Sequence, residues 1–416
     1  ESKEFFYFIL FFNVVLLFFT RFYPSMNGPA HLYNANIFSE ILKGNETVKE
    51  FYSINPILVP NWTSHFILGT MMLLFPAWVA EKIFMLLYVA GMAVSFRFLI
   101  RQINQDAIFL SVLIFPFIYS FLFHLGFYNY CFSFAFFFFA LGFFLKYQTS
   151  FNPKRYICLS LLLVGTYFSN ALVFGFLGLV LGLFVIYNTY EVYKGSNDVK
   201  SSFRFGARKL LLLLLVSLPG LVMLFIFFKN VTFFPSDEVY PKKELIKWIN
   251  DARAFIVYDY SGDEILTEQY FHILLILAAL SFVGIKYSKK FELKKADILF
   301  IPVLIVLVLY FLTPNGASAG MMSDRYCLIL FVFGLLWVCA RSVKTQLSKV
   351  LVLAMIVVHV GLFFNHLNGA IKSLDKNAQT ISQSSQYIKE NNIVLPVNLS
   401  DNWLEPHFSN YIGVDK

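Results

Sequence analysis

The sequence predicts an all-α protein that crosses a membrane many times. Hydrophobic residues make up 58% of the 416 residues and charged residues only 14%, whereas a soluble domain carries about 25% charged residues. The mean hydropathy is +0.67, and apolar runs of spanning length recur along the chain. The net charge of +8 is therefore interpreted through its distribution over the loops, and not as the mark of a nucleic-acid partner.

Eleven apolar runs are predicted to be transmembrane helices. They cover residues 5–20, 83–100, 107–123, 131–147, 156–169, 172–190, 210–228, 270–285, 298–312, 326–340 and 350–364. No small-residue cleavage site follows the first run, so we interpret it as a retained helix and not as a signal peptide. A further run, 64–80, is interrupted by Pro76 and is expected to lie in the interface.

The distribution of Lys and Arg predicts the orientation. If 64–80 does not span, one side of the membrane receives 19 of the 33 Lys and Arg but 7 of the 25 Asp and Glu. Loops rich in Lys and Arg stay in the cytoplasm, so the N-terminus is predicted inside and the C-terminus outside. The Phe-rich composition suits a Bacteroidota-like bacterium, which predicts a multi-pass protein of the bacterial inner membrane with a periplasmic C-terminus.

Two domains are predicted. Residues 1–364 form the transmembrane domain, with a first exterior loop at 21–82 and a second large one at 229–269. Residues 365–416 mix helix-like and strand-like pieces, and we expect them to begin a small exterior domain that is cut short here. Interfacial helices are expected in the first loop.

The first exterior loop carries polar residues where the chain leaves the bilayer. In PSMNGPAHLYNA, Pro29 suits a helix start, and His31 and Asn34 share a helix face with Asn27 just upstream. Tyr33 belongs to the same stretch. The alternative is that Asn27 and Gly28 form a plain turn and that His31 is a surface histidine.

Three further exterior stretches hold candidate residues. Asn61, Trp62 and His65 precede the run 64–80, and Tyr128 and Asn129 lie in a short turn beside His124. Both stretches are also typical of belts of interfacial aromatic residues. Asp324 and Arg325 lie at the mouth of a span, where Arg suits phosphate but also snorkels to the interface. Lys242 belongs to an amphipathic segment that lies on anionic lipid or lines a site.

Together these features resemble the GT-C superfamily of membrane glycosyltransferases, which includes protein O-mannosyltransferases, oligosaccharyltransferases and aminoarabinose transferases. The resemblance covers most of the chain in architecture, and its motifs are short. It implies transfer of a sugar from a polyprenyl-phosphate carrier to a protein or glycan acceptor outside the cytosol. Arg325 would hold the carrier phosphate, assisted by His65 or Lys242. Residues that would line the sugar or acceptor site are Tyr33, Asn34, Asn61, Trp62, Tyr128, Asn129 and Asp324. His31 would line the same site.

The first loop of that superfamily usually carries an acidic residue where this chain has Asn27. An amide cannot accept a proton at neutral pH, which leaves three explanations. Asn27 replaces a natural aspartate and makes the chain inactive, or another residue such as His31 or Glu81 is the base, or the protein binds glycan or lipid without catalysis. The first is favoured because the rest of the motif is intact. No second carboxylate is expected near Asn27, so a divalent metal is possible but not favoured, and no other cofactor is implied.

Other functional classes are weighed against this hypothesis. A transporter of lipid-linked saccharides would predict repeated halves and ionisable residues in mid-span. The sequence shows neither, and His359 is the clearest mid-span exception. A membrane assembly subunit would suit the amide at position 27. A polysaccharide polymerase or ligase would differ chiefly in the length of its donor.

Overall fold

The computed structural model describes residues 2–231, 238–286, 295–316, 320–341, 345–389, 392 and 394–414. Over these residues every regular element is a helix, as predicted. The α-helices are α1 Ser2–Leu16, α2 Gly28–Lys43, α3 Glu46–Phe51, α4 Thr63–Met72, α5 Ala77–Ile103, α6 Phe115–Ile118, α7 Phe121–His124, α8 Tyr128–Tyr147, α9 Pro153–Ser169, α10 Ala171–Ser196, α11 Val199–Asn230, α12 Lys242–Asn250, α13 Tyr260–Lys286, α14 Phe300–Leu312, α15 Met322–Arg341, α16 Gln346–His366 and α17 Lys372–Gln383. Shorter turns include η2 Gln105–Ile114, η3 Arg253–Phe255, the π-helix η5 Leu367–Ile371 and η7 Phe408–Gly413.

In this described part of the chain, nine helical segments are long and apolar enough to cross a bilayer. They are Ala77–Ile103, Gln105–His124, Tyr128–Tyr147, Ala171–Ser196, Val199–Asn230, Tyr260–Phe282, Lys295–Leu312, Met322–Arg341 and Gln346–Tyr387, and each contains most of one predicted run. The remaining predicted spans, 5–20 and 156–169, lie largely in α1 and α9. These helices have 15 and 17 residues, whereas a perpendicular span needs about 20 residues. The multi-pass class is therefore confirmed, and the count of eleven stays a prediction.

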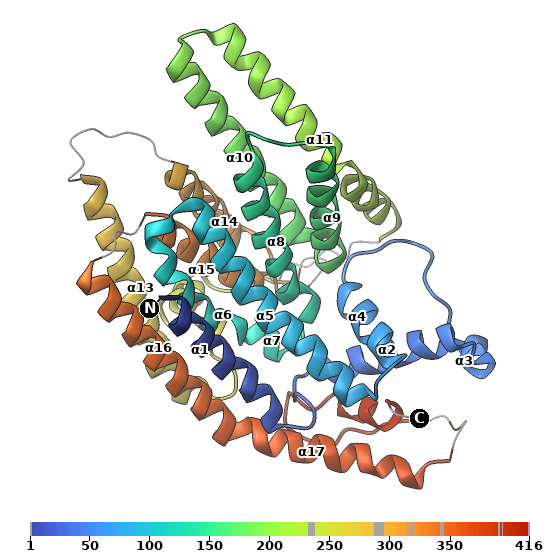
Figure 1. Cartoon of the computed structure of the whole chain (residues 1–416). Coiled ribbons are helices and arrows are strands. Elements are labelled where there is room, and N and C mark those ends of the chain that lie inside the picture. Colours follow the sequence, from blue (N-terminus) through green and yellow to red (C-terminus); the bar gives the residue numbers. More distant parts are fainter. Residues whose placement is uncertain are drawn as a thin grey trace.

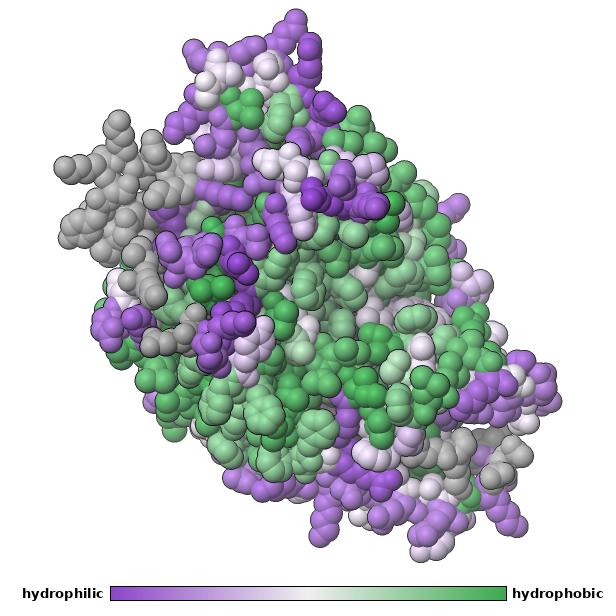
Figure 2. Space-filling view, in the orientation of Figure 1, coloured by the Kyte–Doolittle hydropathy of each residue, from purple (hydrophilic) through white to green (hydrophobic). Residues whose placement is uncertain are grey.

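The molecule has two hydrophilic ends. The turn between α10 and α11 projects from one end, and α2, α3, α4 and α17 gather at the other (Figure 1). Figure 2 shows a broad hydrophobic band between them. This distribution is the one expected for a protein surrounded by lipid at mid-height.

The first loop is helical, and before α5 begins at Ala77 it contains no helix of spanning length, so only the last residues of the run 64–80 belong to a candidate span and not to the interface as predicted. The run 64–80 is divided, because α4 ends at Met72 and Pro76 adopts an extended conformation with ψ 155° before α5. A helix of the 10 residues of α4 is about 15 Å long, half of the about 30 Å hydrocarbon core. Thus α4 alone cannot span, and the helices α2, α3 and α4 occupy the segment where interfacial helices were expected.

The tail packs onto the first loop. Helix α16 continues through η5 into α17, where the Asp375 carboxylate accepts hydrogen bonds from the backbone N–H groups of Arg21 at 3.1 Å and Phe22 at 3.0 Å. The rings of Phe22 and Tyr411 lie 4.4 Å apart. The described residues of the tail contain no strand, and residues 394–402, which the sequence makes strand-like in part, form no regular element. First loop and tail form one layer over this end of the bundle.

Candidate functional site

A tight turn between α7 and α8 supports the first loop. Backbone N–H groups of Met26 and Asn27 donate to the carbonyl oxygens of His124 at 3.1 Å and Leu125 at 3.2 Å. Gly126 has φ +77°, and a Cβ there would lie 2.8 Å from the backbone nitrogen of Asn27. Only glycine meets both conditions without strain. This turn therefore fixes where α2 begins.

His31 joins the turn to α4. Its Nε2 lies 2.9 Å from the carbonyl oxygen of Gly126, and its Nδ1 lies 3.0 Å from Nε2 of His65 and 3.1 Å from the hydroxyl of Ser64. A carbonyl oxygen only accepts, so Nε2 of His31 carries the proton and donates. In the neutral ring Nδ1 is then the acceptor. Both ring nitrogens are thus engaged within the protein.

Burial changes the acidity of both histidines. The pKa of His31 falls to about 3, first because burial disfavours the imidazolium ion and second because His65 lies beside it. Burial likewise lowers the pKa of His65 to about 4. Both rings are therefore neutral near pH 7, and His31 is a weak base whose lone pair already accepts a hydrogen bond.

Two asparagines connect α8 to the start of α4. The Asn129 side-chain oxygen accepts from the backbone N–H of Ser64 at 2.6 Å, and its NH₂ group donates to the carbonyl of Asn61 at 2.8 Å. The Asn61 side-chain oxygen in turn accepts from Asn170 at 3.3 Å. Asn129 is 3% exposed, so these bonds replace water that its amide would otherwise bind.

The amide of Asn27 has a structural partner. Its Nδ2 donates to the Leu125 carbonyl at 2.9 Å, and its side chain makes no capping bond to α2. A carboxylate at this position could not donate to that carbonyl. The local structure therefore uses the side-chain N–H donor that asparagine has and an ionised aspartate lacks.

Tyr128 completes the group. Its hydroxyl lies 2.6 Å from the hydroxyl of Ser25, which also accepts from the backbone N–H of Gly28 at 3.1 Å, and its ring stacks on His31 at 5.3 Å. We call the following residues the turn cluster: Ser25, Asn27, His31, Asn61, Ser64, His65, Tyr128 and Asn129. The sequence missed Ser25 and Ser64, although both lie within or beside the stretches that it singled out.

Arg325 approaches the same turn from α15. Its guanidinium lies 4.7 Å from the Phe127 ring and 5.2 Å from the Tyr130 ring, and its Nε donates to the Gly320 carbonyl at 3.1 Å. It is 6% exposed. The neighbouring Asp324 lies 3.9 Å from Arg253. The guanidinium is therefore held by aromatic faces next to the residues that carry the turn cluster.

Four other candidates lie outside the turn cluster. Tyr33 packs against Gly413 of the tail, where a Cβ would lie 2.7 Å from its ring, and Asn34 is exposed on α2. The Trp62 ring meets Phe38 edge-on at 5.9 Å. Lys242 is exposed at the start of α12.

Glu81 lies buried behind the first loop. Its Oε2 accepts from the backbone N–H of Tyr23 at 2.9 Å, whereas Oε1 has no hydrogen-bond partner within the described residues. Its side chain is 0% exposed. The adjacent Lys82 donates to the Thr20 hydroxyl at 3.2 Å. Glu81 is thus a fully buried carboxylate whose second oxygen accepts no hydrogen bond from the described residues.

A second buried polar group connects α7, α13 and α16. Asp263 accepts from His366 Nε2 at 2.9 Å and from the backbone N–H of Val257 at 3.0 Å. His124 Nδ1 lies 2.8 Å from the Tyr258 hydroxyl. Sequence reasoning missed this group because its members lie at the ends of different spans, where polar residues are common.

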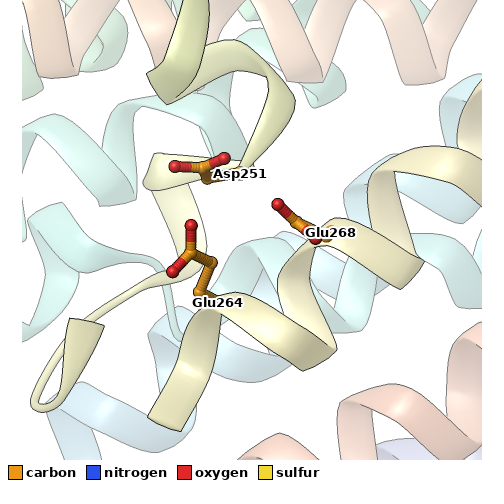
Figure 3. Close-up of side chains that lie close together, drawn as sticks. All are labelled: Asp251, Glu264 and Glu268. Atoms are coloured by element: carbon orange, nitrogen blue, oxygen red, sulfur yellow. The ribbon is translucent and has the colours of Figure 1, made fainter. Parts of the chain in front are cut away.

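Three carboxylates between the end of α12 and the start of α13 could hold a cation. Asp251, Glu264 and Glu268 have ligand oxygens within 4.8 Å of one another, and Figure 3 shows them side by side at the loop after α12 and the first turns of α13. Lys247 lies 3.7 Å from Asp251 and 3.5 Å from Glu264, so an ammonium already balances part of this charge. These residues were not among the sequence candidates.

Comparisons with protein-family models, with curated proteins and with solved structures find no match.

Proposed function

We propose that the protein is a membrane glycosyltransferase that acts on a polyprenyl-phosphate-linked sugar at the end of the molecule formed by α2, α4 and α17. The observation that carries the proposal is the convergence of two kinds of group on one turn. Amide, imidazole and hydroxyl groups of the turn cluster suit sugar hydroxyls, and Arg325 beside the same turn suits a phosphate.

In the proposed reaction, the acceptor oxygen attacks the anomeric carbon of the donor. The bond between that carbon and the phosphate oxygen breaks, and the carrier phosphate leaves with the electron pair. Arg325 stabilises the negative charge on the leaving phosphate. The acceptor's proton passes to a base, which is the role that the resemblance gives to an acidic residue at position 27.

Asn27 cannot take that proton, so transfer by this chain is proposed to be slow. His31 is a poor replacement, because its pKa is about 3 and both its nitrogens are engaged. Glu81 is the better one, because Oε1 has no partner in the described structure. A metal-independent mechanism is proposed, in which Asp251, Glu264 and Glu268 take no part.

The test is consumption of a labelled polyprenyl-phosphate sugar by membranes that contain the protein. We expect slow consumption that Glu81→Gln abolishes and that Arg204→Ala, an exposed change at the opposite end, leaves unchanged. If neither the chain as written nor Asn27→Asp consumes any donor from a mixed pool of lipid-linked sugars, the enzymatic proposal fails.

A second candidate is a non-catalytic subunit that binds glycan or lipid. The observation that favours it is the hydrogen bond from the Asn27 amide to the Leu125 carbonyl at 2.9 Å. This bond gives Asn27 a structural role that does not require a catalytic aspartate to have been lost. This candidate predicts saturable binding of lipid-linked saccharide with no turnover by either form at position 27.

For location, we propose the bacterial inner membrane, with the turn cluster on the periplasmic side. The charge asymmetry of the loops supports this orientation. A cysteine placed at Thr47 in α3 should react with an impermeant reagent in intact cells, and one at Asn197 between α10 and α11 should not. The opposite pattern would move the turn cluster to the cytoplasm.

A further inference from the structure

A cavity of about 210 Å³ lies between α8, α9, α10 and α11. Its walls are largely apolar, with Phe144, Phe151 and Leu213 among them, and its polar lining includes Gln148, Asn188 and Lys209. Ligand pockets for whole small molecules measure about 300–1,000 Å³, so this cavity suits part of a long molecule. An apolar cavity with a cationic rim suits a chain that ends in an anion.

The polar side of the cavity is organised around Gln148. Lys209 Nζ donates to its backbone carbonyl at 3.0 Å, and Asn188 Nδ2 donates to its side-chain oxygen at 3.1 Å. An ammonium has three N–H donors, so Lys209 can hold this carbonyl and still bind a phosphate oxygen. Its partial burial reduces competition from water.

Lys209 lies at the boundary between polar and apolar residues of α11. Residues 210–215 are all leucine, whereas the turns before Lys209 contain Arg204 and Arg208. This position corresponds to the headgroup level of a bilayer, with the leucines beside the acyl chains. A lipid whose phosphate met Lys209 would therefore have its chain at the depth of the cavity.

The surroundings carry a strong positive charge. Basic residues of this end are Lys146, Lys154, Arg155, Lys194, Lys200, Arg204, Arg208 and Lys209, and the acidic residues of the α10–α11 hairpin are Glu191 and Asp198. The Arg155 guanidinium lies 4.2 Å from the centre of the Tyr147 ring, and Tyr147 directly precedes Gln148 in the sequence. Such clusters attract anionic lipid with about 1 kcal/mol for each Lys or Arg near the surface.

We propose that this cavity binds one acyl chain of an anionic phospholipid whose phosphate is held by Lys209. The site is separate from the proposed glycosyl-transfer site, because α2, α4 and α17 lie at the opposite end of the molecule (Figure 1). It takes its lipid from the leaflet on the side of the α10–α11 turn. The proposal does not depend on any catalytic activity.

The test measures lipid binding to the purified full chain by native mass spectrometry. Phosphatidylglycerol and phosphatidylcholine with the same acyl chains are the probes. We expect phosphatidylglycerol to bind about ten-fold more tightly, because both lipids carry a phosphate but only phosphatidylcholine adds a quaternary ammonium, which offsets the negative charge that Lys209 attracts. Lys209→Gln should remove most of the preference, whereas Lys376→Gln, the same charge change at an exposed position of α17 at the opposite end of the molecule, should retain it. Equal binding of the two lipids, or an equal loss in both variants, would overturn the proposal.

A second pair of variants tests the cavity itself. Val216→Phe fills it and should weaken both phospholipids at least about five-fold, whereas Leu214→Phe on the exposed face of α11 should weaken neither. Unfolding temperatures show whether both variants remain folded. Unchanged lipid binding in folded Val216→Phe would exclude the cavity as the site. Displacement of phosphatidylglycerol by an equimolar polyprenyl phosphate would identify the carrier lipid as the occupant instead.

Discussion

Asn27→Asp gives the sharpest test of the proposed function, because it changes one group and has two separate consequences. The amide donates to the Leu125 carbonyl at 2.9 Å. A carboxylate loses this bond, which contributes about 0.5–1.5 kcal/mol to stability. The carbonyl retains the backbone N–H of Asn27 at 3.2 Å, so it is not left without a partner.

A gain offsets part of that loss. Position 27 precedes the first residue of α2, and a negative charge at a helix N-terminus stabilises by about 0.3–1 kcal/mol. The net loss is therefore about 1 kcal/mol or less, and the unfolding temperature should fall by no more than about 4 °C. The variant remains folded, so its activity can be interpreted.

Transfer should respond in the opposite direction. A positioned general base contributes about 10²–10⁴-fold, so Asn27→Asp should raise the rate of sugar transfer at least about a hundred-fold with little change in donor affinity. The rate should decline at low pH as the new carboxylate takes up a proton. The assay compares both forms in liposomes with a polyprenyl-phosphate sugar and a mixture of acceptors.

The matched control is Asn36→Asp in the same helix. Asn36 also donates its amide to a backbone carbonyl, that of Gly413 at 3.1 Å, so the control reproduces the loss of a hydrogen bond away from the turn cluster. It should lower stability by about 1 kcal/mol and leave transfer unchanged. If Asn27→Asp is folded and transfers no faster than the chain as written, position 27 does not supply the base.

Three further outcomes are expected. His31 has a pKa of about 3 in the folded protein and 6.5 as its ordinary value, so its contribution to stability is complete above about pH 6.5 and is lost as the pH falls toward 3. Between these pH values the unfolding temperature should therefore fall less in His31→Gln than in the chain as written. An unchanged pH profile of the unfolding temperature would contradict the burial argument. Arg325→Ala should weaken donor binding about ten-fold or more while exposed Arg204→Ala does not, and equal affinities in purified protein would remove Arg325 from the site. Gly126→Ala should lower the unfolding temperature more than Gly44→Ala, since both have positive φ but only Gly126 lacks room for a Cβ; similar shifts would show that the turn adapts.

The candidate site was predictable in part. Asn27, His31, Asn61, His65, Tyr128 and Asn129 were chosen from the sequence, and all six belong to the turn cluster. Lys242 and Asn34 were chosen by the same kind of reasoning and are exposed. Polar residues at an interface have the same sequence signature whether they face protein or solvent, so the sequence could not separate these two groups.

The sequence by itself determined that this is a multi-pass helical membrane protein. A run of apolar residues in a bilayer must satisfy its own backbone hydrogen bonds, and a helix is the local way to do so. This is why nine of the predicted runs reappear as candidate spans within the described part of the chain. Tertiary structure alone decided which polar groups meet. His31 contacts His65, 34 residues away, and Gly126, 95 residues away, and Asp375 binds Arg21 across 354 residues. Such pairs depend on how the helices pack, and side-chain periodicity within one helix carries no information about the neighbour that it will face.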